Sequence, residues 1–142
     1  MTVQKVFDMA IHIMDEQNES TGETSTVDTQ EYKHRTISIL NNIIPVLYPY
    51  SDTYDKSGEG RPEPPLLSLG QSYKNPEFNQ EIGLDETITA SLLPLYLAAQ
   101  LIIAENTELA QWFMARFQVA FADAKAKIPA EFETIYAPYG LF

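Results

Sequence analysis

Two pairs of side chains in the sequence could do acid–base or metal chemistry. Asp52 and Asp55 lie three residues apart, a spacing at which two carboxylates could hold a hard cation or transfer a proton. The spacing of an EF-hand is absent and no partner base is recognisable, so the pattern favours a solvated acidic turn. His12 and His34 belong to no HExxH motif and to no His-rich tract, which indicates surface histidines rather than metal ligands.

Other catalytic signatures are missing from the sequence. Residues 57–61, Ser-Gly-Glu-Gly-Arg, contain glycines but no Walker lysine, and the stretch is typical of a flexible turn. There is no Gly-x-Ser-x-Gly motif, and the lack of cysteine excludes a disulfide scaffold, a thiolate zinc site and a cysteine nucleophile. We therefore expect a protein that is not an enzyme and that holds no cofactor and no metal.

Composition and charge narrow the class of protein further. The chain of 142 residues is 44% hydrophobic, which predicts one globular domain over residues 1–142. Its 20 acidic and 9 basic residues give a net charge of −11, which argues against a surface that wraps nucleic acid or binds an anionic membrane. The most apolar run, 90–104, is too short for a membrane span, and the N-terminal stretch lacks a signal-peptide pattern. We expect no membrane contact and a cytoplasmic protein.

Apolar residues recur at helical spacing along much of the chain, which predicts a mainly α fold, a bundle of about four helices. The first helix is expected over residues 3–17, with Thr2 as its cap. The third is expected to open at Asp85 and to end near residue 105, and it is apolar on almost every side. It should therefore lie at the centre of the bundle or in an interface. Pro94 either kinks this helix, the interpretation we favour, or is the first residue of a shorter one.

The second helix has a start signal of its own. Asp28 and Glu31 have the spacing of a capping box, and Val27 and Tyr32 occupy the two positions of a hydrophobic staple. Pro45 lies within the apolar pattern that follows. Because proline lacks a backbone donor and crowds the preceding turn, we expect the helix to end or kink there.

A fourth helix is expected to begin after Asn106 and to end near Pro129. Helical spacing and acidic surroundings favour a core position, rather than a stacking platform for bases, for its aromatic residues Trp112, Phe113, Phe117 and Phe121. Arg116 is the one charge near this stripe. We expect it to form a salt bridge with an acid such as Glu105 or Glu108.

Two further segments differ from the helices. Residues 48–84 hold five of the nine prolines and four of the six glycines, which predicts a long loop with a short β-hairpin around 66–69 and 77–82, or one that reaches a partner. The C-terminal arm, 129–142, is too apolar to be fully solvated, so we expect it to dock on its own domain or on a neighbouring subunit. The candidate contacts with a subunit or partner are aromatic residues of the loop and the arm: Tyr73, Phe78, Tyr136, Tyr139 and Phe142.

Several stretches resemble small helical proteins that are encoded beside the capsid genes of tailed phages. They are Ile-Gly-Leu-Asp-Glu at 82–86, Leu-Pro-Leu-Tyr-Leu-Ala-Ala at 93–99, Ala-Glu-Asn at 104–106, Trp-Phe-x-x-Arg-Phe at 112–117, and Glu-Tyr-Lys-x-Arg-Thr-x-x-Ile-Leu-Asn at 31–41. The resemblance covers residues 29–48 and 82–124, a little under half of the chain. These stretches are packing patterns rather than catalytic signatures.

The proteins that the chain resembles are head–tail connectors, also called adaptor or head-completion proteins. The resemblance implies a non-enzymatic structural protein whose copies form a ring beneath the portal, join the head to the tail and line the DNA channel. Its partners would be other copies of itself, the portal and tail-completion proteins, and DNA would pass without specific binding. It would occur in the cytoplasm of the bacterial host and then in the virion.

Two alternatives remain open from the sequence. An acidic helical adaptor or regulatory protein would bind a single protein partner through the middle loop, as a possible mimic of DNA. That function predicts carboxylates concentrated on one face of the molecule. A hydrolase or nuclease that uses Asp52 and Asp55 is the third and weakest hypothesis.

Overall fold

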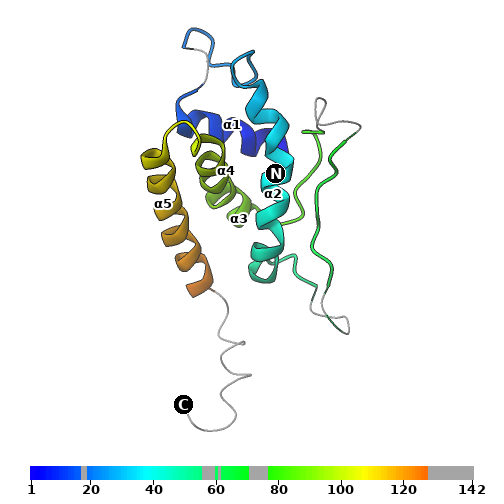
Figure 1. Cartoon of the computed structure of the whole chain (residues 1–142). Coiled ribbons are helices and arrows are strands. Elements are labelled where there is room, and N and C mark those ends of the chain that lie inside the picture. The colour runs from blue at the N-terminus through cyan, green and yellow to red at the C-terminus, as the bar shows by residue number, and fades with distance from the viewer. Residues whose placement is uncertain (17–18, 56–59, 61, 71–76, 128–142) are drawn as a thin grey trace.

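The computed structural model describes residues 1–16, 19–55, 60, 62–70 and 77–127 (Figure 1). This part of the chain forms five α-helices and one short 3-10 helix: α1 (Val3–Met14), α2 (Gln30–Leu47), η1 (Tyr48–Tyr50), α3 (Glu86–Ser91), α4 (Leu93–Ile102) and α5 (Thr107–Ala126). Only Leu92 separates α3 from α4, and together they correspond to the third helix that the sequence predicts. The prediction of a mainly α bundle of about four helices is confirmed.

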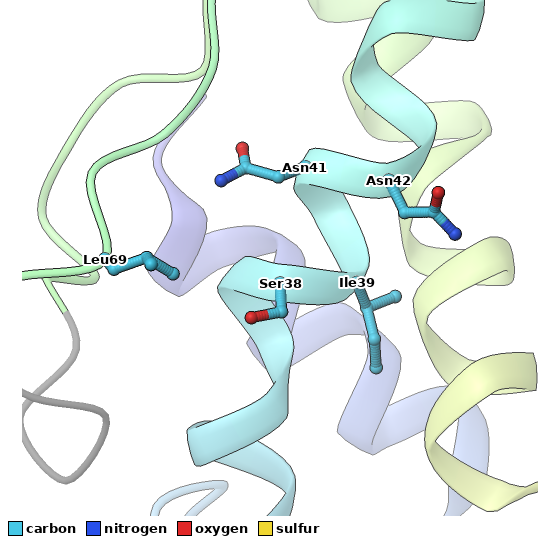
Figure 2. A pocket seen from close by; sticks show the side chains of 5 residues that line it. All are labelled: Ser38, Ile39, Asn41, Asn42 and Leu69. Atoms are coloured by element: carbon cyan, nitrogen blue, oxygen red, sulfur yellow. The ribbon is translucent and has the colours of Figure 1, made fainter.

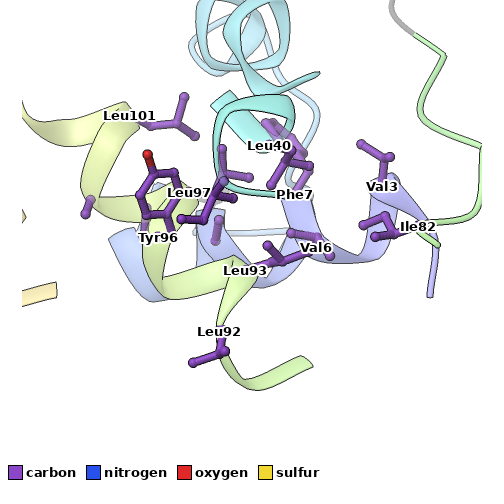
Figure 3. Close-up of a cluster of buried hydrophobic side chains, with 14 of the residues drawn as sticks. Val3, Val6, Phe7, Leu40, Ile82, Leu92, Leu93, Tyr96, Leu97 and Leu101 are labelled. Atoms are coloured by element: carbon purple, nitrogen blue, oxygen red, sulfur yellow. The ribbon is translucent and has the colours of Figure 1, made fainter. Parts of the chain in front are cut away.

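Helix α4 lies at the centre of this bundle. It packs against α1, α2, α3 and α5. Leu93, Leu97 and Leu101 on α4 are completely buried, and Figure 3 shows them gathered with Phe7 of α1 and Leu40 of α2. The central position agrees with the sequence, because a helix that is apolar on every side needs neighbours on every side.

Three of the predicted helix caps are present. Thr2, Asp85 and Asn106 each precede a helix, and their side-chain oxygens accept hydrogen bonds from backbone N–H groups of the first turn. These bonds satisfy donors that have no partner within the helix.

The capping box predicted at Asp28 is wrong. Helix α2 begins at Gln30, and the residue before it is Thr29, whose side chain does not cap the helix. Thr29 is fully buried and its Oγ1 donates to the carbonyl of Thr24 over 2.6 Å, so the residue fixes the preceding loop. Val27 is 86% exposed and forms no staple with Tyr32. The capping-box pattern was misleading because the buried side chain of Thr29, rather than that of Asp28, fixes the chain just before α2.

Both internal prolines lie within helical structure. Pro94 is the second residue of α4, a position at which the missing N–H costs nothing, and the break falls just before it at Leu92. The observed arrangement lies between the two predicted alternatives. Helix α2 continues through Pro45 to Leu47 and then tightens into η1, which contains Pro49.

The predicted hairpin within 48–84 does not form in the described part of this segment. The stretch 77–82 instead bonds to the start of the chain: Val3 N donates to Gln80 O, Gln4 N to Phe78 O, and Ile82 N to Met1 O. These backbone groups of 77–82 are bonded to the start of the chain, so they do not pair with the backbone of residues 66–69. The side chain of Gln80 makes the link to that stretch instead, because its Oε1 accepts a hydrogen bond from Ser68 N over 2.9 Å. The segment also contributes Leu67, Phe78, Ile82 and Leu84 to the core.

Candidate interaction surfaces

The residues considered for acid–base or metal chemistry form no site. Asp52 is exposed, and its backbone N–H donates to Asp85 Oδ2 over 2.9 Å. The backbone N–H of Asp55 donates to the Tyr48 hydroxyl over 3.3 Å. His12 is exposed on α1, and His34 is half-buried on α2. Among the described residues, no three His, Cys, Asp or Glu side chains stand close enough to hold a metal ion.

Helix α5 exposes a row of uncharged residues that we name the α5 stripe. Its members recur every three or four positions and are all exposed: Trp112, Ala115, Val119, Ala122 and Ala126. Trp112 is 54% exposed and Val119 is 64% exposed. At 3.6 residues per turn, this row lies opposite the face of α5 that packs on α4.

The other face of α5 carries the aromatic core contacts that the sequence predicts. Phe113 and Phe117 are buried, and the Phe117 ring centroid lies 5.4 Å from that of Tyr96 on α4. Phe121 is half-buried and its centroid lies 5.4 Å from that of Tyr50. The core prediction for Trp112 is wrong. Helix α5 is therefore apolar on two faces, only one of which is covered in the described structure.

Arg116 does not form the predicted ion pair within the part of the chain that is described. Its guanidinium instead lies 4.9 Å from the centroid of the Trp112 ring, at a distance typical of a cation–π contact. Glu105 accepts a hydrogen bond from the Tyr32 hydroxyl. Arg116 therefore marks the edge of the α5 stripe with a positive charge.

A second surface is an open hollow on α2, which we name the α2 hollow. It has a volume of about 560 Å³ and is lined by Ser38, Ile39, Asn41, Asn42 and Leu69. Figure 2 shows Leu69 directed towards Ser38 from the neighbouring extended segment. Leu69 is 59% exposed and the adjacent Leu66 is 57% exposed. The lining carries no charged side chain.

The two surfaces belong to different sides of the molecule. In Figure 1, α5 forms one edge of the bundle, the extended segment 62–70 forms the other, and α2 and α4 lie between them. Exposed carboxylates occur along the whole described chain, for example at Glu23, Glu63 and Glu108. The molecule thus has two uncharged surfaces, while its other exposed parts are rich in acidic groups.

Of the aromatic contact residues predicted from the sequence, only Phe78 lies in the described part of the chain. Phe78 is 6% exposed, and its ring centroid lies 5.2 Å from that of Phe7, so it is a core residue rather than a surface contact. Tyr73, Tyr136, Tyr139 and Phe142 lie outside the described residues.

Sequence reasoning missed the α5 stripe, although the spacing of Trp112 and Val119 carried a signal for a second apolar face. Nothing in the sequence pointed to the α2 hollow, because Leu69 is distant from α2 along the chain.

The residues of the 31–41 motif join α2 to the end of α4. Arg35 Nη2 donates to the carbonyl of Leu101 over 3.0 Å, and Arg35 Nε pairs with Glu31 over 2.6 Å. The Tyr32 hydroxyl donates to Glu105, and burial together with this carboxylate raises the pKa of Tyr32 well above its ordinary value. A positive side chain at the carbonyl end of a helix is favourable. The motif therefore has a structural role in this chain.

Comparison with known proteins identifies no relative. No family model, no curated protein and no solved structure matches the chain. Within the described residues, no helix is both long and apolar enough to cross a membrane.

Proposed function

We propose that the chain is a non-enzymatic structural protein whose copies assemble into a ring, as in the head–tail connectors that its sequence resembles. The observation that carries the proposal is the pair of uncharged surfaces, the α5 stripe and the α2 hollow, on different sides of one small body. A closed ring needs heterologous contacts, in which one surface of each copy meets a different surface of the next. The two surfaces supply such a pair.

The net charge of the chain is the argument for a ring that surrounds DNA without binding it. A net charge of −11 repels phosphate, so a channel wall of this composition lets DNA pass without holding it. The ring would lie between the portal and the tail-completion proteins of a tailed phage. The protein would accumulate in the cytoplasm of the bacterial host and then enter the virion.

The native mass of the purified protein, measured over a wide range of concentration, tests this proposal. We expect a large species that negative-stain images show as a closed ring with a central hole. Val119→Asp and Leu69→Asp each place a charge in one surface and should lower the assembled fraction. Val27→Asp is the matched control, because Val27 is 86% exposed and belongs to neither surface. A chain that stays monomeric at every concentration, with and without a portal protein, contradicts the proposal.

A second candidate function rests on the same net charge. An acidic helical adaptor would bind one basic protein partner, and its affinity would fall steeply as salt is added. A monomer that binds such a partner, and that loses the partner in high salt, would favour this function over the ring.

A further inference from the structure

The α5 stripe has no covering element in the described structure, although it is the outer face of the longest helix. Exposed apolar faces of this kind usually mark a contact. We propose that the stripe is the docking site of the C-terminal segment 128–142 of the same chain. This segment lies outside the described residues and follows Lys127, the C-cap residue of α5.

The segment is long enough to return along the whole helix. Its 15 residues, 128–142, span up to about 50 Å when extended, at roughly 3.3 Å per residue. Helix α5 has 20 residues and is therefore about 30 Å long at 1.5 Å per residue. Direct attachment at Lys127 also gives the segment a high effective concentration at this face. Docking within one chain is therefore favoured over docking on a separate copy.

The side chains of the segment match an apolar surface. Its large aromatic residues recur at intervals of three or four positions: Phe132, Tyr136, Tyr139 and Phe142. After a reversal near Pro129, an extended chain of about six residues covers roughly 20 Å, the distance from the end of α5 back to Trp112. This reach brings Tyr136 to the level of Trp112, and it brings Phe132, which is about half as far along, to the level of Val119.

The charges of the two partners are complementary. Residues 107–127 hold three basic side chains, Arg116, Lys125 and Lys127, against two acidic ones, in a chain whose net charge is strongly negative. The segment 128–142 carries Glu131 and Glu133 and no basic residue. Arg116 lies beside Trp112, and Lys125 Nζ lies 4.6 Å from the Phe121 ring centroid, so positive charge is present near both ends of the stripe. The helix is thus a surface that attracts this segment.

The docking of segment 128–142 on the α5 stripe does not depend on ring assembly. The segment shields the stripe in a single chain, whether or not copies later associate. If the ring also forms, a neighbouring copy competes with the segment for the same surface.

Trp112 is the only tryptophan of the chain and belongs to the stripe, so its fluorescence reports the docking directly. The experiment compares the full-length protein with a full-length variant that carries Tyr136→Ser, Tyr139→Ser and Phe142→Ser. We expect the variant to emit at a longer wavelength and to show a severalfold larger acrylamide quenching constant. Val119→Asp in the full-length chain should produce the same change from the helix side. The matched control is Val27→Ser with Val46→Ser, which alters exposed apolar residues that belong to neither the α5 stripe nor the α2 hollow and should leave Trp112 unchanged.

A dilution series identifies the source of the shielding. Protection of Trp112 that does not depend on protein concentration supports docking within one chain. Protection that disappears on dilution shows that another copy covers the stripe, and it overturns the proposal. Equal quenching of the wild-type protein and the triple variant also overturns it, as does an equal change in the control.

Discussion

The side-chain amide of Asn41 binds both backbone polar groups of Leu67. Leu67 N donates to Asn41 Oδ1 over 2.7 Å, and Asn41 Nδ2 donates to Leu67 O over 3.0 Å. The side chain of Gln80 binds Ser68, the residue after Leu67, in the same way. Its Oε1 accepts from Ser68 N over 2.9 Å, and its Nε2 donates to Ser68 O over 2.8 Å. Successive residues of an extended chain point their backbone groups to opposite sides. Residues 66–69 are therefore held between α2 and the 77–82 stretch by two amide side chains in place of neighbouring strands.

Replacement of Asn41 should release this extended segment from α2. In Asn41→Ala the N–H and C=O of the buried residue Leu67 lose their partners, which should lower the free energy of unfolding by about 2 kcal/mol. Urea denaturation followed by circular dichroism measures the change.

Asn42→Ala is the matched control, because Asn42 is exposed and its amide makes only a 3.4 Å contact with the Tyr96 hydroxyl. We expect its stability to stay within about 0.5 kcal/mol of the wild type. Equal losses in the two variants would contradict the role assigned to Asn41.

The helices could be predicted from the sequence, but most of the long middle segment could not. Apolar spacing and the caps Thr2, Asp85 and Asn106 are local signals, so they located α1, α3 and α5. The bonds of Asn41 and Gln80 to residues 66–69 join positions far apart in the chain and leave no local pattern. Amide side chains also occur on ordinary surfaces, so their identity alone does not distinguish a backbone clamp from a solvated group.

The candidate surfaces were predictable only in part. Trp112 has the spacing of both a core residue and an outer-face residue, and the choice between them depends on which neighbour covers α5. Phe78 stands in a segment rich in proline and glycine, where the sequence suggests exposure. The ring is nevertheless buried, because residues 77–82 bond to the start of α1 and place it against Phe7.

Removal of the Tyr32 hydroxyl should change stability in a way that depends on pH. Tyr32→Phe loses a hydrogen bond to the Glu105 carboxylate, which should cost about 1.5 kcal/mol at neutral pH. The pKa of Tyr32 is raised in the folded chain, so the unfolded chain ionises first. The stability that the hydroxyl provides is fully present below about pH 10 and is lost as pH rises above that value.

Unfolding in urea at neutral pH and at several values above pH 10 tests this prediction. The stability difference between the wild type and Tyr32→Phe should shrink as pH rises. Tyr50→Phe is the control, since it keeps the ring contact with Phe121 and should follow the wild type. A difference that stays constant or grows across this range would refute the assignment.

Gly83 should tolerate no side chain, because Pro65 stands directly against it. A Cβ atom added at Gly83 would lie 2.6 Å from Pro65 Cβ and 2.9 Å from Pro65 Cγ, closer than non-bonded carbons approach. Gly83→Ala should therefore lower the free energy of unfolding by about 1–3 kcal/mol, as overpacking does. The double variant with Pro65→Gly removes the crowding atoms, so its loss should be smaller than the sum of the two single losses. Strict additivity would show that Pro65 is not the obstacle.

A mixing experiment distinguishes a heterologous ring from other modes of association. Leu69→Asp damages the α2 hollow and leaves the α5 stripe intact, whereas Val119→Asp does the reverse. If the stripe of one copy meets the hollow of the next, each variant alone should fail to assemble, but the two together should retain one complete contact. Native mass spectrometry should then detect a heterodimer that grows no further, because the remaining free surfaces both carry an added charge. If the mixture stays monomeric, or if either variant alone forms dimers, the two surfaces are not partners and the ring must use other contacts.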